Sequence, residues 1–381
     1  MQSVWNAPNP LLFGRGAISQ IGAELTKLGC RRALVIYDKG VEKAGIAGRV
    51  VELLEAAGIA AVRFDEVQAD PPDWSVEQAG ALGVAEAVDC VVGVGGGSSI
   101  DTAKAAKLLI ANPPPLKQYY GREGVVTKPG VPLIVVPTTA GTGSECTPGG
   151  VITDTERGIK TNIAGVGCQV TLGILDPELT IGLPPGVTAS TGMDALCHCI
   201  ESYTSARANS FSEIAGREGI RLIAKYLVRA VENGGDLEAR EGMMLAAALG
   251  GIAMGGALCH LSHDIGRSLG AKFHVPHGNG CAACLPQVLD AVSDVKQSQV
   301  QYFADAFGAA DAKTAALTLM RRIKLPTLRD LGLERDALLA AVPDEVVMQC
   351  QMAAKAGIVT SPLTVTRELI ANIVSKAYDE N

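Results

Sequence analysis

Short apolar runs that alternate with helical patterns dominate the first 145 residues of this 381-residue chain. The apolar runs are rich in β-branched residues, as in RRALVIYD and DCVVGVGGG, whereas WSVEQAGALGVAEAV has helical spacing. Strands that are apolar throughout and alternate with helices indicate a parallel sheet covered on both faces. The predicted strands are 31–38, 59–67, 89–97 and the start of 130–145; the predicted helices are 41–58, 74–88 and 99–112.

The pattern changes near residue 180, where LDPELTIGLPPGVTAST is rich in Pro, Gly and Thr. Beyond this junction the spacing is helical, including a long pattern over 240–269, and no convincing strand follows. A chain of this length is also too long for one ordinary core. We therefore expect a Rossmann-like α/β domain over 1–182, an all-α domain over 183–381, and a cleft between them.

Composition excludes several classes of partner. The net charge of −7 gives no general basis for binding the phosphate backbone of a nucleic acid, so a nucleic-acid partner is not expected. No run reaches the roughly 18–20 apolar residues that span a bilayer, and the N-terminus lacks the regions of a signal peptide. Ten cysteines without such a signal predict reduced thiols and a cytoplasmic protein that binds no membrane.

Glycines mark a turn from strand to helix in VVGVGGGSSIDTAKAAK, where Gly95, Gly96 and Gly97 precede Ser98. Glycines let the backbone approach a ligand closely, and free amides at a helix start favour phosphate. We expect Ser98 or Ser99 at the helix N-cap. The turn is neither a Walker loop nor the usual G-x-G-x-x-G, so by itself it fits a turn without a ligand equally well.

A second loop, PTTAGTGSE, follows another buried strand and carries hydroxyls at Thr138, Thr139 and Ser144. Such composition also makes ordinary loops, but two such loops after parallel strands favour a dinucleotide site. Asp38 ends the first strand, where a carboxylate accepts hydrogen bonds from a ribose and repels a 2′-phosphate. With a dinucleotide bound, Asp38 predicts NAD rather than NADP; the alternative is a plain strand-end cap.

Histidine is rare in this chain and clustered. Four of the five histidines fall in HLSHDIGRSLGAKFHVPHG, and the fifth is His198. Asp194 lies four residues before His198, after VTASTG, which is typical of a helix start, so the two share one helix face. With His263 and His277 they offer one carboxylate and three imidazoles, which suit Fe²⁺ or Zn²⁺. His260 is an alternative ligand, and separate packing roles are the alternative for each histidine.

Cysteines near these histidines suggest a rival zinc site made of thiolates. Cys197 and Cys199 flank His198, and Cys281 and Cys284 form a C-x-x-C pair. The first pair points to different faces of a helix, and GCAACLPQVL is typical of an apolar helix in which cysteine acts as a small hydrophobe. The thiolate site is therefore the weaker interpretation.

Taken together, these motifs resemble the iron-containing (group III) alcohol dehydrogenases. GVGGGSSIDTAKAAK is similar to the family's pyrophosphate loop and PTTAGTGSE to its second cofactor loop. GLPPGVTASTGMDALCHCIESYTS and AKFHVPHGNGCAACLP look like its two signature segments. The resemblance covers essentially the whole chain and implies the architecture shared with dehydroquinate synthase, commonly as a homodimer or larger oligomer. It implies an oxidoreductase that interconverts alcohols with aldehydes or ketones, using NAD and Fe²⁺ or, alternatively, Zn²⁺.

The resemblance also implies which residues bind. It places the metal on the same four residues, Asp194, His198, His263 and His277. It places the cofactor on a set of loop residues and two further positions: Asp38, Gly96, Gly97, Ser98, Asp101, Thr138, Thr139, Ser144, Lys160 and Leu179. The metal then polarises the alcohol or carbonyl oxygen while hydride passes to or from nicotinamide.

Arg267 departs from the family, because most members carry a second histidine there, four residues after the ligand His263. A guanidinium cannot shuttle protons near neutral pH, so His274, a ribose hydroxyl or water must take that role. Arg267 suits a carboxylate, sulfonate or phosphonate. We therefore expect a small alcohol or aldehyde with an anionic tail. An equal alternative is that Arg267 pairs with a nearby acid or the cofactor pyrophosphate.

Three further residues are predicted to line the substrate site. Met254 and Cys259 precede the ligand His263, and Leu363 lies in TSPLTVT where many members have N-P-R. Plain packing is the alternative for each. Two neighbouring functions stay open: reduction of an acidic substrate, as in maleylacetate reductase, and a lyase of the dehydroquinate synthase type, for which Arg267 alone is thin support.

Overall fold

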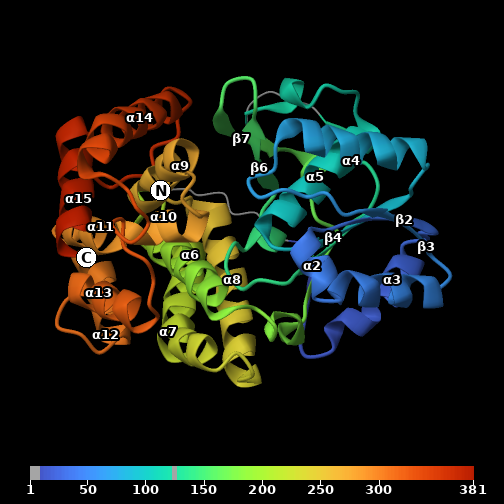
Figure 1. The fold of residues 1–381 in the computed structure, drawn as a ribbon, viewed down its shortest axis with the longest axis horizontal. Helices are drawn as coiled ribbons and strands as arrows, with labels where there is room; N and C mark the ends of the chain where they lie inside the picture. Colours follow the sequence, from blue (N-terminus) through green and yellow to red (C-terminus); the bar gives the residue numbers. More distant parts are fainter. Residues whose placement is uncertain (1–8, 122–126) are drawn as a thin grey trace. The chain divides into compact units, whose positions relative to one another are not determined.

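Two compact units make up the chain in this computed structural model, which describes residues 9–121 and 127–381 (Figure 1). The α/β unit contains the described residues up to 139 together with 143–182, and the helical unit contains 140–142 and 183–381. No strand follows Leu175 in the part of the chain that is described. The prediction of an α/β region followed by an all-helical region is therefore confirmed.

A six-stranded parallel sheet forms the centre of the α/β unit, in the order β1-β8-β5-β4-β2-β3. Alternate residues of one strand enter two different apolar clusters: Val35 packs into one, and Leu34 and Ile36 into the other. Both faces are thus covered, which explains why the central strands are apolar throughout. The strands are β1 (Leu11–Phe13), β2 (Arg32–Ile36), β3 (Ala60–Phe64), β4 (Cys90–Gly95), β5 (Leu133–Pro137) and β8 (Leu172–Leu175).

The helices of the α/β unit mostly follow the predicted order. They are α1 (Ile21–Lys27), α2 (Lys39–Lys43), α3 (Ile46–Ala56), α4 (Asp73–Ala85) and α5 (Gly97–Ala111). The prediction of one helix over 41–58 is wrong, because Gly45 adopts a left-handed φ of 75° and separates α2 from α3. An antiparallel pair, β6 (Gly149–Asp154) and β7 (Ile159–Ala164), was not predicted.

Ten helices form the helical unit in its described residues. They are α6 (Pro185–Thr204), α7 (Ser210–Glu232), α8 (Leu237–Ala257), α9 (Leu261–Phe273), α10 (His277–Ala283), α11 (Leu285–Val292), α12 (Gln297–Ala306), α13 (Ala312–Arg322), α14 (Arg335–Lys355) and α15 (Arg367–Glu380). A helix start after VTASTG is wrong, since Pro185 begins α6 earlier at a position where proline is favoured. The helical pattern over 240–269 is broken because Leu258 adopts a φ of 60° between α8 and α9.

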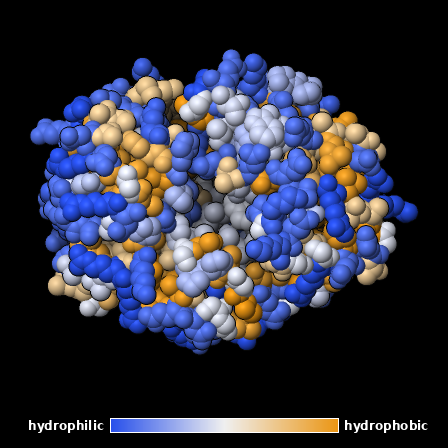
Figure 2. All heavy atoms as spheres, viewed as in Figure 1, coloured by the Kyte–Doolittle hydropathy of each residue, from blue (hydrophilic) through white to orange (hydrophobic). Residues whose placement is uncertain are grey.

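Among the described residues, no single helix is both long and apolar enough to cross a membrane. Only α8 and α9 together meet the length and composition criteria, and they are bent by 102° at their break. On the face shown in Figure 2, hydrophilic residues cover much of the surface and apolar residues lie in patches between them. Such a mixture is usual for folded proteins.

Candidate functional site

Four potential metal ligands from three helices of the helical unit come together. Asp194 and His198 lie one turn apart on α6, His263 is the third residue of α9, and His277 is the first residue of α10. The Asp194 Oδ1 atom lies 3.9 Å from Nε2 of His198. It lies 3.7 Å from Nε2 of His263 and 3.7 Å from Nε2 of His277. Ligand atoms about 2.0–2.2 Å from one ion lie roughly 3–4 Å from each other, so each of these three distances suits a pair of donors to one divalent ion.

Burial disfavours the charged form of His263, and metal binding requires a neutral imidazole. The side chains of Asp194, His198 and His263 are only 3–5% exposed, and that of His277 is 35% exposed. Burial and the neighbouring His198 hold the pKa of His263 well below its usual value. Its buried Nε2 makes no hydrogen bond with the described residues. Burying a polar atom without a hydrogen bond costs free energy. These observations fit a site for Fe²⁺ or Zn²⁺.

Protein acceptors hold the second ring nitrogen of two of these histidines. Nδ1 of His198 lies 3.3 Å from the carbonyl oxygen of Gly141. Nδ1 of His263 lies 2.5 Å from a carboxylate oxygen of Glu201 on α6. When each Nδ1–H donates in this way, Nε2 is left with its lone pair facing the other ligand atoms.

Two thiols also approach the metal-site residues. Cys281 Sγ lies within 4.8 Å of ligand atoms of three of the four, and Cys259 Sγ is equally close to two of them. Burial raises the pKa of both thiols well above the usual value, so both are protonated. Cys197, Cys199 and Cys284 join no such group in the described part of the chain. The rival zinc site of four thiolates therefore does not assemble there.

Arg267 lies on α9, one turn after His263, and its side chain is half-buried. Its guanidinium makes no ion pair or hydrogen bond with the described residues, although its charge acts on the half-buried Asp264 and Cys259 and on the buried Cys281. Burial raises the pKa of Asp264 to about 6, and Arg267 opposes this rise. Of the two alternative roles for Arg267, pairing with a neighbouring acid is therefore not observed.

The glycine turn of the α/β unit is tight. Gly95 has a φ of 146°, and a Cβ atom there would lie 2.5 Å from Oγ of Ser99. The helix α5 begins at Gly97, and its N-cap is Gly96, without a side-chain hydrogen bond. The prediction of Ser98 or Ser99 as N-cap is therefore wrong, because the helix starts before either serine. Without a side-chain cap, amides of the first turn remain available to an anion.

Asp38 lies beside this turn, just beyond the end of β2. Its carboxylate accepts a hydrogen bond from the Val41 amide at 2.9 Å, and Ser99 Oγ lies 3.5 Å from its other oxygen. The helix-capping role is therefore present. Because β2 and β4 are neighbours in a parallel sheet, the half-buried carboxylate and the glycine turn lie at the same sheet edge.

Buried hydrogen bonds attach the second predicted cofactor loop to α5. Lys104 is fully buried and donates to the carbonyl oxygens of Ser144 and Gly149, at 2.6 and 2.7 Å, and to two hydroxyls. Asp101 accepts from the Ser144 hydroxyl at 2.6 Å. Two predicted cofactor residues, Asp101 and Ser144, therefore bind each other and shape the loop.

The remaining predicted cofactor residues have varied surroundings. Thr138 is buried and Thr139 half-buried in the same loop. Lys160 on β7 pairs with Asp70 at 2.6 Å. Leu179 packs into an apolar cluster of the α/β unit.

Comparison with known proteins identifies the family. Residues 8–177 match the family model "Iron-containing alcohol dehydrogenase", and residues 188–378 match "Fe-containing alcohol dehydrogenase family, C-terminal". The chain belongs to the iron-containing alcohol dehydrogenase family. Its fold, with a parallel α/β region and a helical region, is that of the family, and the family resemblance of its sequence motifs is confirmed.

Relatives of this iron-containing alcohol dehydrogenase act on varied substrates. It is 37% identical to choline dehydrogenase of Bacillus subtilis, over 87% of this chain and 86% of that protein. It is 35% identical to the NAD-dependent methanol dehydrogenase of Bacillus methanolicus, over 82% and 84%. The structure of sulfoacetaldehyde reductase from Bifidobacterium kashiwanohense in complex with NAD⁺ matches with a TM-score of 0.89 and 27% identity over 100% of both chains. These relatives support an oxidoreductase of CH–OH donors, and not the maleylacetate reductase or lyase alternatives.

Not all predicted substrate-site residues of this alcohol dehydrogenase are found in contact with the proposed metal ligands. His274 ends α9 with a left-handed φ of 56°, and it is exposed. Met254 is half-buried in the last turn of α8. Leu363 packs against the apolar cluster that contains Leu261 and Ile265 of α9. Of the predicted substrate-site residues, Cys259 is the one grouped with metal-site histidines.

Sequence reasoning missed Glu201 in this iron-containing alcohol dehydrogenase. It follows Asp194 by seven residues and His198 by three on α6. These spacings place all three on one helix face. The spacing could therefore have indicated Glu201, but a glutamate at such spacing is also common on helices that bind no ligand.

Proposed function

We propose that this chain is a metal-dependent, NAD(H)-linked alcohol dehydrogenase or aldehyde reductase for small substrates with an anionic tail. In this proposal residues 1–182 bind the dinucleotide, and residues 183–381 hold the metal and the substrate. The observation that carries the proposal is the approach of three imidazole Nε2 atoms to one Asp194 oxygen, at 3.7–3.9 Å. Fe²⁺ is the proposed ion, with Zn²⁺ as the alternative for the same donors.

When bound, the ion supplies a Lewis acid for the alcohol or carbonyl oxygen, and NAD(H) supplies or accepts hydride. The chain's own residues set the charge around that chemistry. The Asp194 carboxylate would offset one of the two positive charges of the ion and imidazole ligands would offset none, so the site would favour an oxygen that gains negative charge. The turn at Gly96, Gly97 and Ser98 would hold the pyrophosphate, and Asp38 the adenosine ribose.

Proton transfer needs a group other than Arg267, whose guanidinium stays charged. We assign this role to His274, which is exposed at the end of α9 and can exchange a proton with water. Thr138, Thr139 and Ser144 of the second loop and Asp101 of α5 complete the proposed cofactor site, together with Lys160 and Leu179.

Arg267 determines the charge of the substrate in this proposal. Its guanidinium is half-buried and makes no described ion pair or hydrogen bond. A partly desolvated charge is costly until an anion binds it, and guanidinium binds carboxylates and sulfonates in a fork-like geometry. The named substrates of the relatives include a cation, a neutral alcohol and a sulfonate. Family membership therefore does not determine the charge of the substrate, and Arg267 supports an anionic substrate.

NADH oxidation by the purified protein with a panel of aldehydes, alongside metal analysis, tests the activity. We expect turnover by protein that contains a first-row transition metal. NADH should be used in preference to NADPH, because Asp38 repels a 2′-phosphate. Protein that turns over no carbonyl compound and carries no transition metal contradicts the proposed function.

Substitution of Arg267 tests the anionic tail separately. We expect Arg267→Leu to lower kcat/KM for an anionic aldehyde by about 10- to 100-fold, because a hydrogen bond to a charged group contributes about 1.5–3 kcal/mol. A neutral aldehyde of equal length should change little, and Arg267→Lys should fall between. An unchanged ratio of the two kcat/KM values rules out the tail and leaves the cofactor pyrophosphate as the partner of Arg267.

We also propose that the enzyme is cytoplasmic and forms a homodimer or larger homo-oligomer. All ten cysteines are free thiols, which suits a reducing compartment. The oligomer is proposed from the family resemblance alone.

A further inference from the structure

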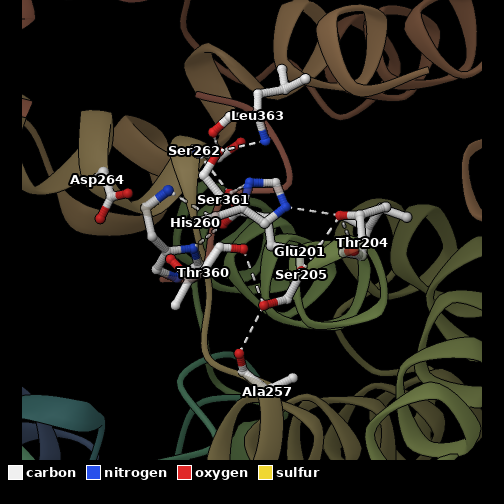
Figure 3. Close-up of polar contacts among 12 residues, drawn as sticks. Glu201, Thr204, Ser205, Ala257, His260, Ser262, Asp264, Thr360, Ser361 and Leu363 are labelled. Atoms are coloured by element: carbon white, nitrogen blue, oxygen red, sulfur yellow. Dashed lines mark hydrogen bonds and ion pairs between the residues drawn. The ribbon is translucent and has the colours of Figure 1, made fainter. Parts of the chain in front are cut away.

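Glu201 is a buried carboxylate on α6 that touches His263. Figure 3 shows Glu201 together with its neighbours Ser262 and His260. Its side chain is 1% exposed. It accepts hydrogen bonds from the Ser262 amide at 2.6 Å, the His263 amide at 3.2 Å and the His263 ring Nδ1 at 2.5 Å. One carboxylate therefore holds both the backbone and the ring of the same proposed metal ligand.

The two amides belong to the first turn of α9. His260 is the N-cap residue of this helix, but its side chain makes no capping hydrogen bond. An N-cap side chain normally accepts from the second or third amide of the helix. Here these are the amides of Ser262 and His263, and Glu201 caps them from another helix. Burial raises the pKa of Glu201, and these two amide hydrogen bonds oppose the rise.

His260 lies beside Glu201 and hydrogen-bonds to Thr204 (Figure 3). His260 is fully buried, with Nδ1 3.4 Å from Oε1 of Glu201 and Nε2 2.8 Å from the Thr204 hydroxyl. That hydroxyl donates its one proton to the Ile200 carbonyl at 2.8 Å, so it accepts the Nε2–H of His260. The direction of the His260 ring is thereby determined.

A strained connection leads into this array. Leu258 adopts φ 60° and ψ 159°, a region that is nearly restricted to glycine. The preceding residue, Ala257, accepts a hydrogen bond from the Ser205 hydroxyl at 2.8 Å (Figure 3). Strained backbone persists only where surrounding contacts hold it. At this break the chain bends by 102°, so α9 starts in a different direction from α8.

We propose that Glu201 is a positioning residue for the metal ligand His263. Glu201 selects the Nδ1–H tautomer of His263 and orients the ring, so that Nε2 is presented to the ion. The inference rests on the proposed metal site.

Metal affinity of matched variants tests this inference. Glu201→Gln keeps the size of the side chain but places an amide –NH₂ among N–H donors. We expect its dissociation constant for Co²⁺, measured by chelator competition, to rise about 10- to 100-fold, the usual effect of losing such a partner. The visible absorption band of bound Co²⁺ should also change. Glu201→Asp, whose shorter side chain draws the carboxylate back from the His263 ring, should act in the same direction.

A control separates positioning from stability. Asp176 is also a buried carboxylate that accepts from backbone amides, those of Gly16 and Ile18 at 3.1 and 3.2 Å. Asp176→Asn should lower the Tm of the metal-free protein and leave the Co²⁺ affinity within about twofold, as expected of a role in stability alone. A Glu201→Gln protein that loses only Tm, with unchanged affinity and absorption band, overturns the inference. If that variant does not fold, an unchanged affinity in Glu201→Asp overturns it instead. A wild-type protein that binds no Co²⁺ refutes the proposed metal site itself.

Discussion

Replacing His263 by alanine is expected to reduce kcat/KM for every substrate by about a thousandfold or more. Lewis-acid stabilisation by a bound ion contributes several kcal/mol, and each 1.4 kcal/mol is a tenfold change in rate. His263 is central to the donor group, because its Nε2 faces Asp194 at 3.7 Å and its ring lies 4.6 Å from that of His198. Its removal leaves three of four donors and frees the carboxylate of Glu201.

Metal content and activity, measured on the same samples, check this expectation. Chelator treatment of the wild-type protein should cause the same loss, and addition of Fe²⁺ or Zn²⁺ should restore activity to the wild type but not to His263→Ala. A variant that keeps its metal and its rate would show that the four residues are not the metal site.

Replacing Lys104 by methionine is expected to lower the free energy of unfolding by about 3–5 kcal/mol. Lys104 is fully buried, and its Nζ lies 3.9 Å from Asp101 and donates to four acceptors in residues 144–149. Burial lowers the pKa of Lys104, and the charge of Asp101 opposes this change. Methionine fills the volume but leaves Asp101 without its cation and the loop carbonyls without a donor.

Urea unfolding checks this value, with Lys107→Met as the matched control. Lys107 is also buried but donates to one carbonyl, that of Gln169, at 2.6 Å. Its loss should cost about 1.5–3 kcal/mol, the usual value for a hydrogen bond to a charged group. The double variant Asp101→Asn with Lys104→Met should lose less than the sum of the single changes, because the two side chains interact. Additive losses would mean that the interaction between Asp101 and Lys104 contributes nothing to the free energy of unfolding.

The fold could be predicted where apolar patterns extend over whole elements. The central strands β2, β4 and β5 are buried on both faces, so nearly every residue in them is apolar. The edge strand β1 has only three residues and β8 only four, too few to show a pattern. The breaks at Gly45 and Leu258 depend on single backbone angles, 75° and 60°, that spacing does not reveal.

Helix starts were also difficult to predict. Serine is a common N-cap, and two serines follow the glycine turn, but α5 starts before both of them with Gly96 as its cap. Proline at the first helical position starts α6 at Pro185, well before the threonines and serine that suggested a start. In both places the turn geometry of the preceding strand or loop outweighed the local preference for a capping side chain.

By itself the sequence determined the class of fold, the family and the types of donor that the chain can offer to a metal. These depend on residue identity and on periodicity, which are local properties. Only the tertiary structure decided that α6, α9 and α10 bring Asp194 and three imidazoles together. It also decided that Glu201 accepts hydrogen bonds from His263 and that Arg267 forms no ion pair with the described residues. Such contacts join residues up to 83 positions apart, from Asp194 to His277, and packing rather than spacing brings such residues together.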